Sequence, residues 1–383
     1  MDYNVLVKKL KAKKVICFGA SDAAIKLFEL MPLLKVELFV DNDINKHGQL
    51  FLNKAICHPT ILKSIQKDEY FIVITSSYRN EIAMQLKELG FSDEQDFCDY
   101  MDVKNSLNLN LHFENGHYYS PIPNLHEIKE NEQTLFSKNK EIGGVEINEE
   151  GQLQMFSSFL ESIESFYKII HEKETLRYYT PNGFFEFFDA ATLYSTLKRF
   201  KPKRIIEVGS GFSSSVMLDT RDKLNLNMEL TFIEPFPDRL NGLLTEKDKE
   251  NSTIIVSKVQ DVHLDIFRSL EAGDILFIDS SHVSKIGSDV NYLIFEVLPE
   301  LKEGVIIHFH DIFYPFEYPK EWLEKGYYWN EAYVLRSFLQ YNRSFSIMYW
   351  NDFIYDKQQG KLKDEYLSMG GSFGGSLWLK KLD

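Results

Sequence analysis

Short apolar runs alternate with amphipathic stretches in the first part of the chain, a pattern typical of strands and helices in turn. The runs at residues 15–18, 36–40 and 71–74 have the length and continuous apolar character of buried parallel strands. Helical stretches follow at residues 23–30 and again up to Leu89. This alternation predicts a parallel α/β sheet.

The same alternation returns after residue 200, over five apolar runs that each end in polar residues. These runs lie at residues 203–208, 229–233, 252–256, 274–279 and 304–311. In an open α/β sheet, ligands bind at the carboxyl ends of the strands. The second part of the chain is therefore expected to carry its chemistry at one sheet edge.

Composition changes near residue 103, where we place the domain boundary. Cys17, Cys57 and Cys98 are the only cysteines, and all lie before it. Of the net charge of −14, residues 1–103 carry −2 and the remainder −12. Residues 104–111 are predicted to be a connector. We predict an N-terminal Rossmann-like domain at 1–103, a connector with a helical lead-in at 104–200, and a catalytic core at 201–383.

Composition excludes several classes of protein. Apolar residues make up 44% of the 383 residues, too many for a disordered chain, and no run of about 18 uncharged apolar residues predicts a membrane span. The acidic balance argues against nucleic acid or an anionic membrane as partner. The sparse cysteines lack a CxxC spacing, which argues against disulfides and a cysteine zinc site. We find no secretory signal and expect a cytoplasmic protein.

The turn after the first apolar run has part of a dinucleotide-binding pattern. Of the expected glycines only Gly19 is present, Ala24 occupies the last position, and Asp41 lies where an acid would hold a ribose. This part resembles the Rossmann-like domain found beside many bacterial sugar-modifying enzymes, which binds a nucleotide-sugar or a nicotinamide cofactor. A purely structural module is the alternative.

A second glycine turn follows the run at residues 203–208 and contains Gly209, Ser210, Gly211 and Ser213. The glycines let a ligand approach the backbone closely, and the hydroxyls and helix-start amides can donate hydrogen bonds to it. Glu207 lies inside the strand, where an isolated buried carboxylate would be costly. We expect it to face a cationic ligand, or else to pair with a basic residue of the sheet.

Glu234 ends the next run, 27 residues after Glu207, which is about one strand–helix–strand step. An acid at this position can accept hydrogen bonds from both hydroxyls of a ribose, with helix capping as the alternative. Asp261 or Gln260, after the third run, is the candidate for contact with an adenine amino group, unless it faces solvent.

Together these motifs resemble the class I S-adenosylmethionine (SAM)-dependent methyltransferases. Glu-Val-Gly-Ser-Gly at 207–211 is similar to the glycine-rich first motif of that family, and Glu234 to its ribose-binding acid. Asp279 and Asp311 are similar to the acidic ends of its fourth and fifth strands. The pattern Phe-Ile-Asp-x-x-His followed by Phe-His-Asp-Ile is similar to a bacterial branch of sugar and natural-product O-methyltransferases. The resemblance covers most of residues 105–383.

The resemblance implies a seven-stranded, mostly parallel sheet whose last strand is antiparallel, preceded here by a turn at residues 370–375. It implies SAM as cofactor and methylation of a hydroxyl of a sugar or natural-product precursor, as in polysaccharide biosynthesis. The chemistry of the residues agrees. Glu207, Glu234 and Asp261 suit a sulfonium, an ammonium and a ribose, whereas the phosphates of a dinucleotide prefer basic groups and helix amides.

Asp279, His282, His310 and Asp311 form a polar cluster with three interpretations. Asp279, His310 and Asp311 would hold a divalent metal such as magnesium, although related methyltransferases have an acid or amide where His310 stands. Alternatively, His282 or His310 takes the proton from the attacking hydroxyl beside Asp279. A hydrogen-bonded structural network is the third. His308 alternates with His310 along the strand and is expected to be structural.

Aromatic and proline residues are dense between residues 314 and 329. This stretch is predicted to be a wall or lid for a small-molecule or sugar acceptor, or else a cap over the sheet or the subunit contact of a homo-oligomer. Two other functions stay open for the whole chain. One is a nucleotide-sugar-binding or scaffold protein with a degenerate transferase domain, and the other is a nicotinamide-dependent oxidoreductase in the first domain.

Overall fold

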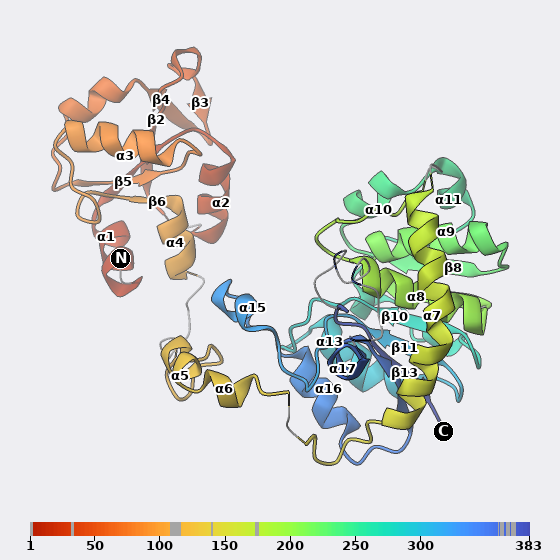
Figure 1. Cartoon of the computed structure of the whole chain (residues 1–383). Helices are drawn as coiled ribbons and strands as arrows, with labels where there is room; N and C mark the ends of the chain where they lie inside the picture. Colours follow the sequence, from red (N-terminus) through yellow and green to blue (C-terminus); the bar gives the residue numbers. More distant parts are fainter. Residues whose placement is uncertain are drawn as a thin grey trace. The chain divides into compact units, whose positions relative to one another are not determined.

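The computed structural model describes residues 3–31, 34–107, 116–138, 141–172, 176–358, 360, 364, 368 and 373–383. The chain forms two compact units, Met1–Asn124 and Leu125–Asp383 (Figure 1). The first unit continues past residue 103, because the helix that starts at Tyr100 packs on its other helices. Residues 108–111 of the predicted connector and 370–372 of the predicted turn lie outside the described residues.

The first unit is a six-stranded sheet in the order β3-β4-β2-β1-β5-β6, parallel except for the β3–β4 pair. Its strands are β1 (Lys14–Phe18), β2 (Val36–Val40), β3 (Leu50–Phe51), β4 (Lys54–Cys57), β5 (Tyr70–Ile74) and β6 (Phe97–Asp99). Its helices are α1 (Tyr3–Ala12), α2 (Asp22–Leu30), η1 (Ile44–Lys46), η2 (Pro59–Lys63), α3 (Arg79–Glu88) and α4 (Tyr100–Leu107). The predicted α/β alternation is confirmed.

The second unit contains a seven-stranded sheet in the order β12-β13-β11-β10-β7-β8-β9. Its strands are β7 (Arg204–Val208), β8 (Glu229–Ile233), β9 (Thr253–Ile255), β10 (Ile275–Ile278), β11 (Ile306–Phe309), β12 (Phe345–Trp350) and β13 (Leu377–Lys381). The last strand, β13, inserts between β11 and β12 and is antiparallel to both. The expected mostly parallel sheet with an antiparallel final strand is confirmed.

Helices pack on this sheet, and one of them is buried on every side. Along α8, every side chain from Phe187 to Leu197 is buried, and the helix packs between α7 and α9 (Figure 1). The helices of the unit are α5 (Leu125–Glu130), α6 (Glu132–Leu135), α7 (Glu149–His171), α8 (Phe187–Phe200), α9 (Phe212–Leu224), α10 (Asp238–Leu243), α11 (Glu246–Glu250), η3 (Val259–Asp261), α12 (Asp265–Arg268), α13 (Asp289–Tyr292), η4 (Leu293–Val297), α14 (Leu298–Glu300), α15 (Lys320–Glu324), α16 (Glu331–Leu339) and α17 (Asn351–Gln358). No helix in the described ranges has the length and apolar character needed to span a bilayer.

The strand register aligns the carboxyl ends of four neighbouring strands. Val208 pairs with Ile233 on one side and Ile278 on the other, and Ile278 pairs with Phe309. The residue directly after each of these strands is polar or glycine, and all four lie at the same edge of the sheet. These residues are Gly209, Glu234, Asp279 and His310.

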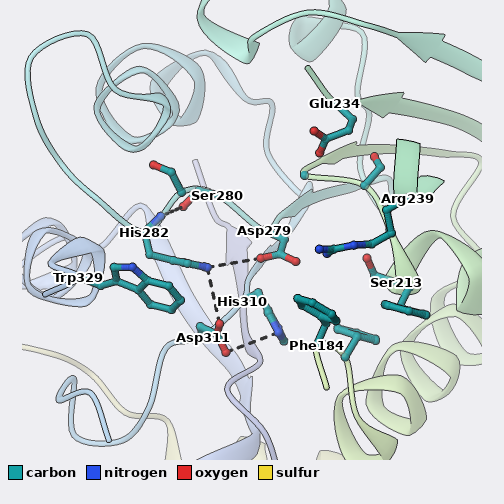
Figure 2. A pocket seen from close by; sticks show the side chains of 16 residues that line it. Phe184, Ser213, Glu234, Arg239, Asp279, Ser280, His282, His310, Asp311 and Trp329 are labelled. Atoms are coloured by element: carbon teal, nitrogen blue, oxygen red, sulfur yellow. Dashed lines mark hydrogen bonds and ion pairs between the residues drawn. The ribbon is translucent and has the colours of Figure 1, made fainter. Parts of the chain in front are cut away.

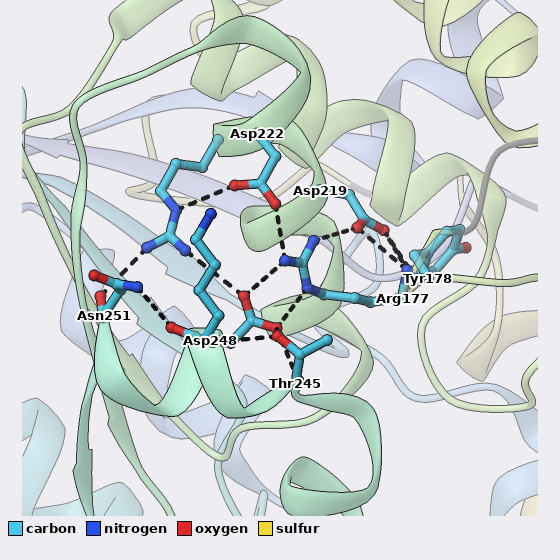
Figure 3. A network of polar contacts seen from close by, with 9 residues as sticks. Arg177, Tyr178, Asp219, Asp222, Thr245, Asp248 and Asn251 are labelled. Carbon is cyan, nitrogen blue, oxygen red and sulfur yellow. Dashed lines mark hydrogen bonds and ion pairs between the residues drawn. The ribbon is translucent and has the colours of Figure 1, made fainter.

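Arg177 ties the segment that precedes α8 to two helices of the second unit. Its guanidinium contacts Asp219 at 2.9 Å, Asp222 at 2.8 Å and Asp248 at 2.6 Å (Figure 3). The carboxylate of Asp219 also accepts hydrogen bonds from the backbone amides of Arg177 and Tyr178. Asp219 and Asp248 are buried, so the charges of this network depend on one another.

We predict that Arg177→Ala destabilises the protein by about 3 kcal/mol, because it leaves two buried carboxylates without their cation. Thermal or urea unfolding measures this loss. Arg268→Ala is the matched control: Arg268 also pairs with two acids, Asp265 and Glu300, but all three side chains are largely exposed. It should lower the stability much less than Arg177→Ala does, because water screens exposed ion pairs. Equal losses in the two variants would contradict the structural role of Arg177.

Candidate active site

A cavity of ≈ 330 Å³ lies at the carboxyl edge of the second sheet (Figure 2). It is lined by nine residues that the sequence predicted as site residues: Gly209, Ser210, Gly211, Ser213, Glu234, Asp279, His282, His310 and Asp311. Six further residues line it without having been predicted as site residues: Phe184, Phe185, Phe212, Arg239, Ser280 and Ser281. Trp329, from the aromatic stretch predicted as a wall or lid, lines it as well. Glu207 and Asp261 are not among the lining residues.

The glycine turn between β7 and α9 is shaped by a close backbone approach. Gly209 has φ +81°, and a Cβ there would lie 1.8 Å from the carbonyl oxygen of Asp279. Only glycine fits this position, which brings the end of β10 against the turn. At Gly211, the nearest atom to an added Cβ would be Cδ of Arg239, at 3.3 Å. Gly211 precedes α9, and its amide donates to Ser214 Oγ.

Glu207 stabilises the glycine turn through hydrogen bonds to the two serines that follow it. Its buried carboxylate accepts hydrogen bonds from Ser213 Oγ, at 2.5 Å, and from Ser214 Oγ. Burial raises the pKa of Glu207 to about 8, although these hydroxyls favour its charged form. Glu207 therefore reaches the cavity through Ser213, which lines it, and positions the loop.

Glu234 and Arg239 lie on the side of the cavity away from His282 (Figure 2). Glu234 follows β8, and its Oε1 accepts a hydrogen bond from the amide of Phe236 at 2.8 Å. The guanidinium of Arg239 lies 3.9 Å from the centre of the Phe184 ring, a cation–π contact. Arg239, in the first turn of α10, adds a positive charge to a predominantly acidic site. Its position five residues after Glu234 was the available clue in the sequence.

The opposite side of the cavity is built around the imidazole of His282. Its Nδ1 lies 2.8 Å from Glu331 Oε2, while its Nε2 lies 3.5 Å from Asp279 Oδ1 and 3.6 Å from Asp311 Oδ2 (Figure 2). The other oxygen of Glu331 accepts a hydrogen bond from Ser280 Oγ at 2.8 Å. Trp329 packs on the imidazole at a centroid distance of 4.4 Å. His282 is thus fixed in position and orientation.

The three acids change the basicity of this histidine. Burial alone would lower the pKa of His282, but hydrogen bonds to Asp279 and Glu331 and the charge of Asp311 raise it well above its usual value. In the same way, burial would raise the pKa of Asp279, while the charges of His310, His282 and Arg239 lower it. The neighbouring acids therefore favour the protonated form of His282.

His310 and Asp311 lie at the floor of the cavity. His310 Nε2 is 3.5 Å from Asp311 Oδ1. Burial opposes the charged form of His310, but the neighbouring acids Asp311, Asp279 and Asp189 raise its pKa to about 8. Burial and the charge of Asp279 raise the pKa of Asp311. His308 is fully buried and bonds to Ser376 Oγ at 3.0 Å, in keeping with a structural role.

Two residues of this cluster have a strained backbone. His282 has φ +59° and Asp311 has φ +56°, in the left-handed region that non-glycine residues rarely adopt. Such residues cost on the order of 1 kcal/mol or more and are typical of active sites. Within the described residues, no group of three or more His, Cys, Asp or Glu side chains has an arrangement suited to a metal ion.

Glu331, like Arg239, is a candidate functional residue that was not predicted from the sequence. It is the first residue of α16, 49 residues after His282, and its side chain is 1% exposed. Only the return of α16 to the sheet edge brings it to the imidazole. Residues 329–331 lie within the stretch that the family resemblance covers, and the acid at 331 was the available signal.

Comparison with known proteins agrees with this geometry. Residues 206–312 match the family model of a methyltransferase domain, which spans the glycine turn, Glu234, Asp279 and Asp311. The second unit is a class I S-adenosylmethionine-dependent methyltransferase. Residues 11–95 match a second model, described as C2185-like, N-terminal. The chain also shares its family with an uncharacterized protein of Archaeoglobus fulgidus, 38% identical over 170 residues, which are 42% of this chain and 74% of the relative.

Solved methyltransferase structures show more distant likeness. CmcI with magnesium and SAM has a TM-score of 0.32 at 18% identity, covering 51% of this chain and 72% of CmcI. The O-methyltransferase TomG of Streptomyces achromogenes in complex with SAM has a TM-score of 0.34 at 11% identity. The match covers 67% of this chain and 96% of TomG. SAH-bound PaMTH1 of Podospora anserina has a TM-score of 0.35 at 14% identity. The match covers 62% of this chain and 98% of PaMTH1. Identification of the methyltransferase unit rests on the family model and the strand order.

The first unit also has a cavity, of ≈ 710 Å³, at the carboxyl ends of its strands. Asp41 lines it, but its carboxylate already accepts hydrogen bonds from the amides of Ala20 and Asp43 and from Lys46 Nζ, each at 2.9 Å. At Gly19, a Cβ would lie 2.5 Å from the carbonyl oxygen of Thr75. Both residues of the partial dinucleotide pattern therefore have structural reasons for their presence.

We predict that Glu207 makes the methyltransferase less stable as pH rises. Its folded pKa of about 8 exceeds the ordinary 4.5, so the folded state binds the proton more tightly across this range. Stability from this group is complete below about pH 4.5 and is lost progressively towards pH 8. The Tm of Glu207→Gln minus the Tm of wild type should therefore increase as the pH rises over that interval.

Glu229→Gln is the control, because Glu229 lies exposed on the neighbouring strand β8. It should leave the pH dependence of Tm unchanged. A pH-independent difference between wild type and Glu207→Gln would contradict a shifted pKa.

Proposed function

We propose that the second unit transfers the methyl group of SAM to a hydroxyl of a small-molecule acceptor, with His282 as the general base. One observation carries the proposal. His282 Nε2 faces the cavity beside Asp279 and Asp311, while Nδ1 is held by the buried carboxylate of Glu331. An imidazole oriented by a carboxylate behind it is suited to taking a proton.

The lining of the cavity fits the separate parts of SAM. Glu234 has one carboxylate oxygen outside its bond to Phe236 and would accept from the ribose hydroxyls. The amides of the glycine turn and Ser213 would hold the amino-acid end, and Arg239 would pair with its carboxylate. Asp279 would attract the ammonium group. When bound, SAM supplies an electrophilic methyl group on a sulfonium.

The residues predicted from sequence to contact the cofactor thus fall into two sets. Gly209, Ser210, Gly211, Ser213, Glu234 and Asp279 line the cavity. Glu207 is proposed to act on the cofactor only by positioning the serine of the turn. Asp261 lies in η3, exposed and outside the lining, and its contact with adenine stays a prediction.

His282 would act on the acceptor side of the cavity. A hydroxyl held near Nε2 would lose its proton to the imidazole as its oxygen becomes bonded to the methyl carbon. Asp279 and Asp311 would stabilise the resulting imidazolium, and Glu331 would keep the ring in place as a positioning residue. Trp329 packs on the imidazole and would limit the access of water from that side.

A divalent metal on Asp279, His310 and Asp311 is the competing proposal. The Nε2 of His282 lies within 3.6 Å of a carboxylate oxygen of both Asp279 and Asp311, and an imidazolium there neutralises the same acids that a metal would need. This arrangement favours His282 as general base over a bound metal. We therefore expect activity to persist in EDTA, and full loss with recovery on adding Mg²⁺ would favour the metal.

We further propose that the acceptor is a sugar or natural-product hydroxyl in a cytoplasmic pathway such as polysaccharide biosynthesis. The aromatic loop that follows β11 supports this proposal, since Trp329 reaches the cavity and aromatic faces pack against sugar rings. The acidic lining argues against a phosphorylated reacting group.

We predict that Glu234→Ala weakens SAM binding at least about tenfold, because two ribose hydrogen bonds to a charged acceptor are lost. Isothermal titration calorimetry with SAM measures it. Glu229→Ala, at the other end of the same strand, is the matched control and should bind SAM as wild type does. If wild type binds no SAM, or both variants bind equally, the assignment of the cofactor site is wrong.

The pH profile of methyl transfer tests the base. Only neutral His282 accepts a proton, and its pKa is raised, so the rate should rise with pH through an alkaline pKa. Glu331→Gln removes one of the charges that raise this pKa, so the rising limb should move to lower pH and the plateau should fall. His282→Ala should remove the limb. An unchanged limb in both variants would show that another group titrates.

A further inference from the structure

A second cavity in the methyltransferase unit, of ≈ 460 Å³, has no assigned role. It lies between the chain just after α6 and the loop that leads from β11 to α15. The rings of Phe136, Phe313, Tyr314 and Tyr318 line it, together with Pro315 and Pro319. Phe136, Phe313 and Tyr314 are only half-buried, so ring surface remains open to a ligand.

Two ion pairs form polar edges on these aromatic walls. Lys138 Nζ contacts both oxygens of Asp352, at 2.7 and 2.8 Å, and Lys320 Nζ contacts Glu132 at 2.7 Å. The first pair joins the segment after Phe136 to α17, and the second joins α6 to the start of α15. Acidic side chains outnumber the two lysines in the lining, since Glu317 and Glu321 also belong to it. The cavity therefore disfavours an anionic ligand.

A continuous row of aromatic rings leads from this cavity to the active site. Phe313 packs on Trp322 at a centroid distance of 5.1 Å, and Trp322 packs on Trp329, also at 5.1 Å. Trp329 in turn lies 4.4 Å from the imidazole of His282. Ring contacts through Trp322 thus connect the wall of the second cavity to the wall of the first.

We propose that the second cavity binds a neutral sugar ring of an extended acceptor, at a distance from the hydroxyl that is methylated. Aromatic side chains offer flat apolar faces to the C–H face of a pyranose, and the paired lysines and carboxylates offer donors and acceptors to its hydroxyls. The absence of a net positive charge on the lining excludes sugar phosphates as the preferred ligand. This assignment rests on the proposed function, since it extends the acceptor site of the same transferase.

Saturation-transfer-difference NMR on the full chain tests it, with maltotriose and cellotriose as neutral probes. Saturation should pass to ring C–H protons of at least one probe. Phe136→Ala should raise the dissociation constant at least about fivefold through loss of one ring contact. Phe136→Leu keeps the apolar volume but lacks the ring, so it should weaken trisaccharide binding as much as Phe136→Ala does. Phe136→Tyr keeps the ring and should bind the trisaccharide like wild type. Phe295→Ala removes an exposed aromatic ring outside this cavity and should bind like wild type.

SAM titration of each variant separates this proposal from the proposed function. The Phe136 variants should bind SAM as wild type does, and their Tm values should stay close to it. If neither trisaccharide receives saturation, or if Phe136→Ala binds them as tightly as wild type does, the proposal of a sugar subsite is wrong. Rescue by Phe136→Leu would show that the side chain only fills space. If wild type fails to bind SAM while the sugar signals still depend on Phe136, the transferase assignment fails and the sugar site remains.

Discussion

The imidazole of His282 balances three carboxylates, and the active site depends on that balance. Asp279, Asp311 and Glu331 come from three different elements and would repel one another without a cation among them. Placing the imidazole there fixes the loop after β10, the end of β11 and the start of α16 together. The left-handed backbone at His282 and Asp311 is tolerated because these contacts over-determine it. We propose that the same imidazole, once neutral, accepts the proton of the acceptor hydroxyl.

The rest of the fold places the glycine turn, Glu234 and Arg239 opposite this cluster, where we propose that the cofactor binds. Gly209 lets β10 approach the turn, Glu207 holds the serines that follow, and Arg177 anchors the segment that carries Phe184 to the cavity. None of these contacts is chemically reactive. Together they set the distance between Glu234 on one side of the cavity and His282 on the other, across which a methyl donor and an acceptor would meet.

Periodicity predicted the central parallel strands well, because a buried parallel strand is a local apolar run. The shorter or peripheral strands β3, β4, β6 and β12 were not predicted. The strand at 229–233 was predicted to its ends, and β10 and β11 were each found within a slightly longer predicted run. Strand-end residues such as Asp279 were predictable because parallel strands end at one edge. Glu331 and Arg239 were not, since tertiary packing of α16 and the loop after β8 brings them in. Glu207 was expected to face a ligand, but hydroxyls from the next turn of chain satisfy its carboxylate.

The central claim is that the cavity holds SAM with its reactive end towards His282. A crystal structure of the full chain with S-adenosylhomocysteine tests it most directly. The account predicts the ribose on Glu234, the amino-acid end at the glycine turn and Arg239, and the sulfur facing the space beside His282 Nε2. A ligand bound in this cavity with its sulfur turned away from His282, or bound elsewhere in the chain, would contradict it.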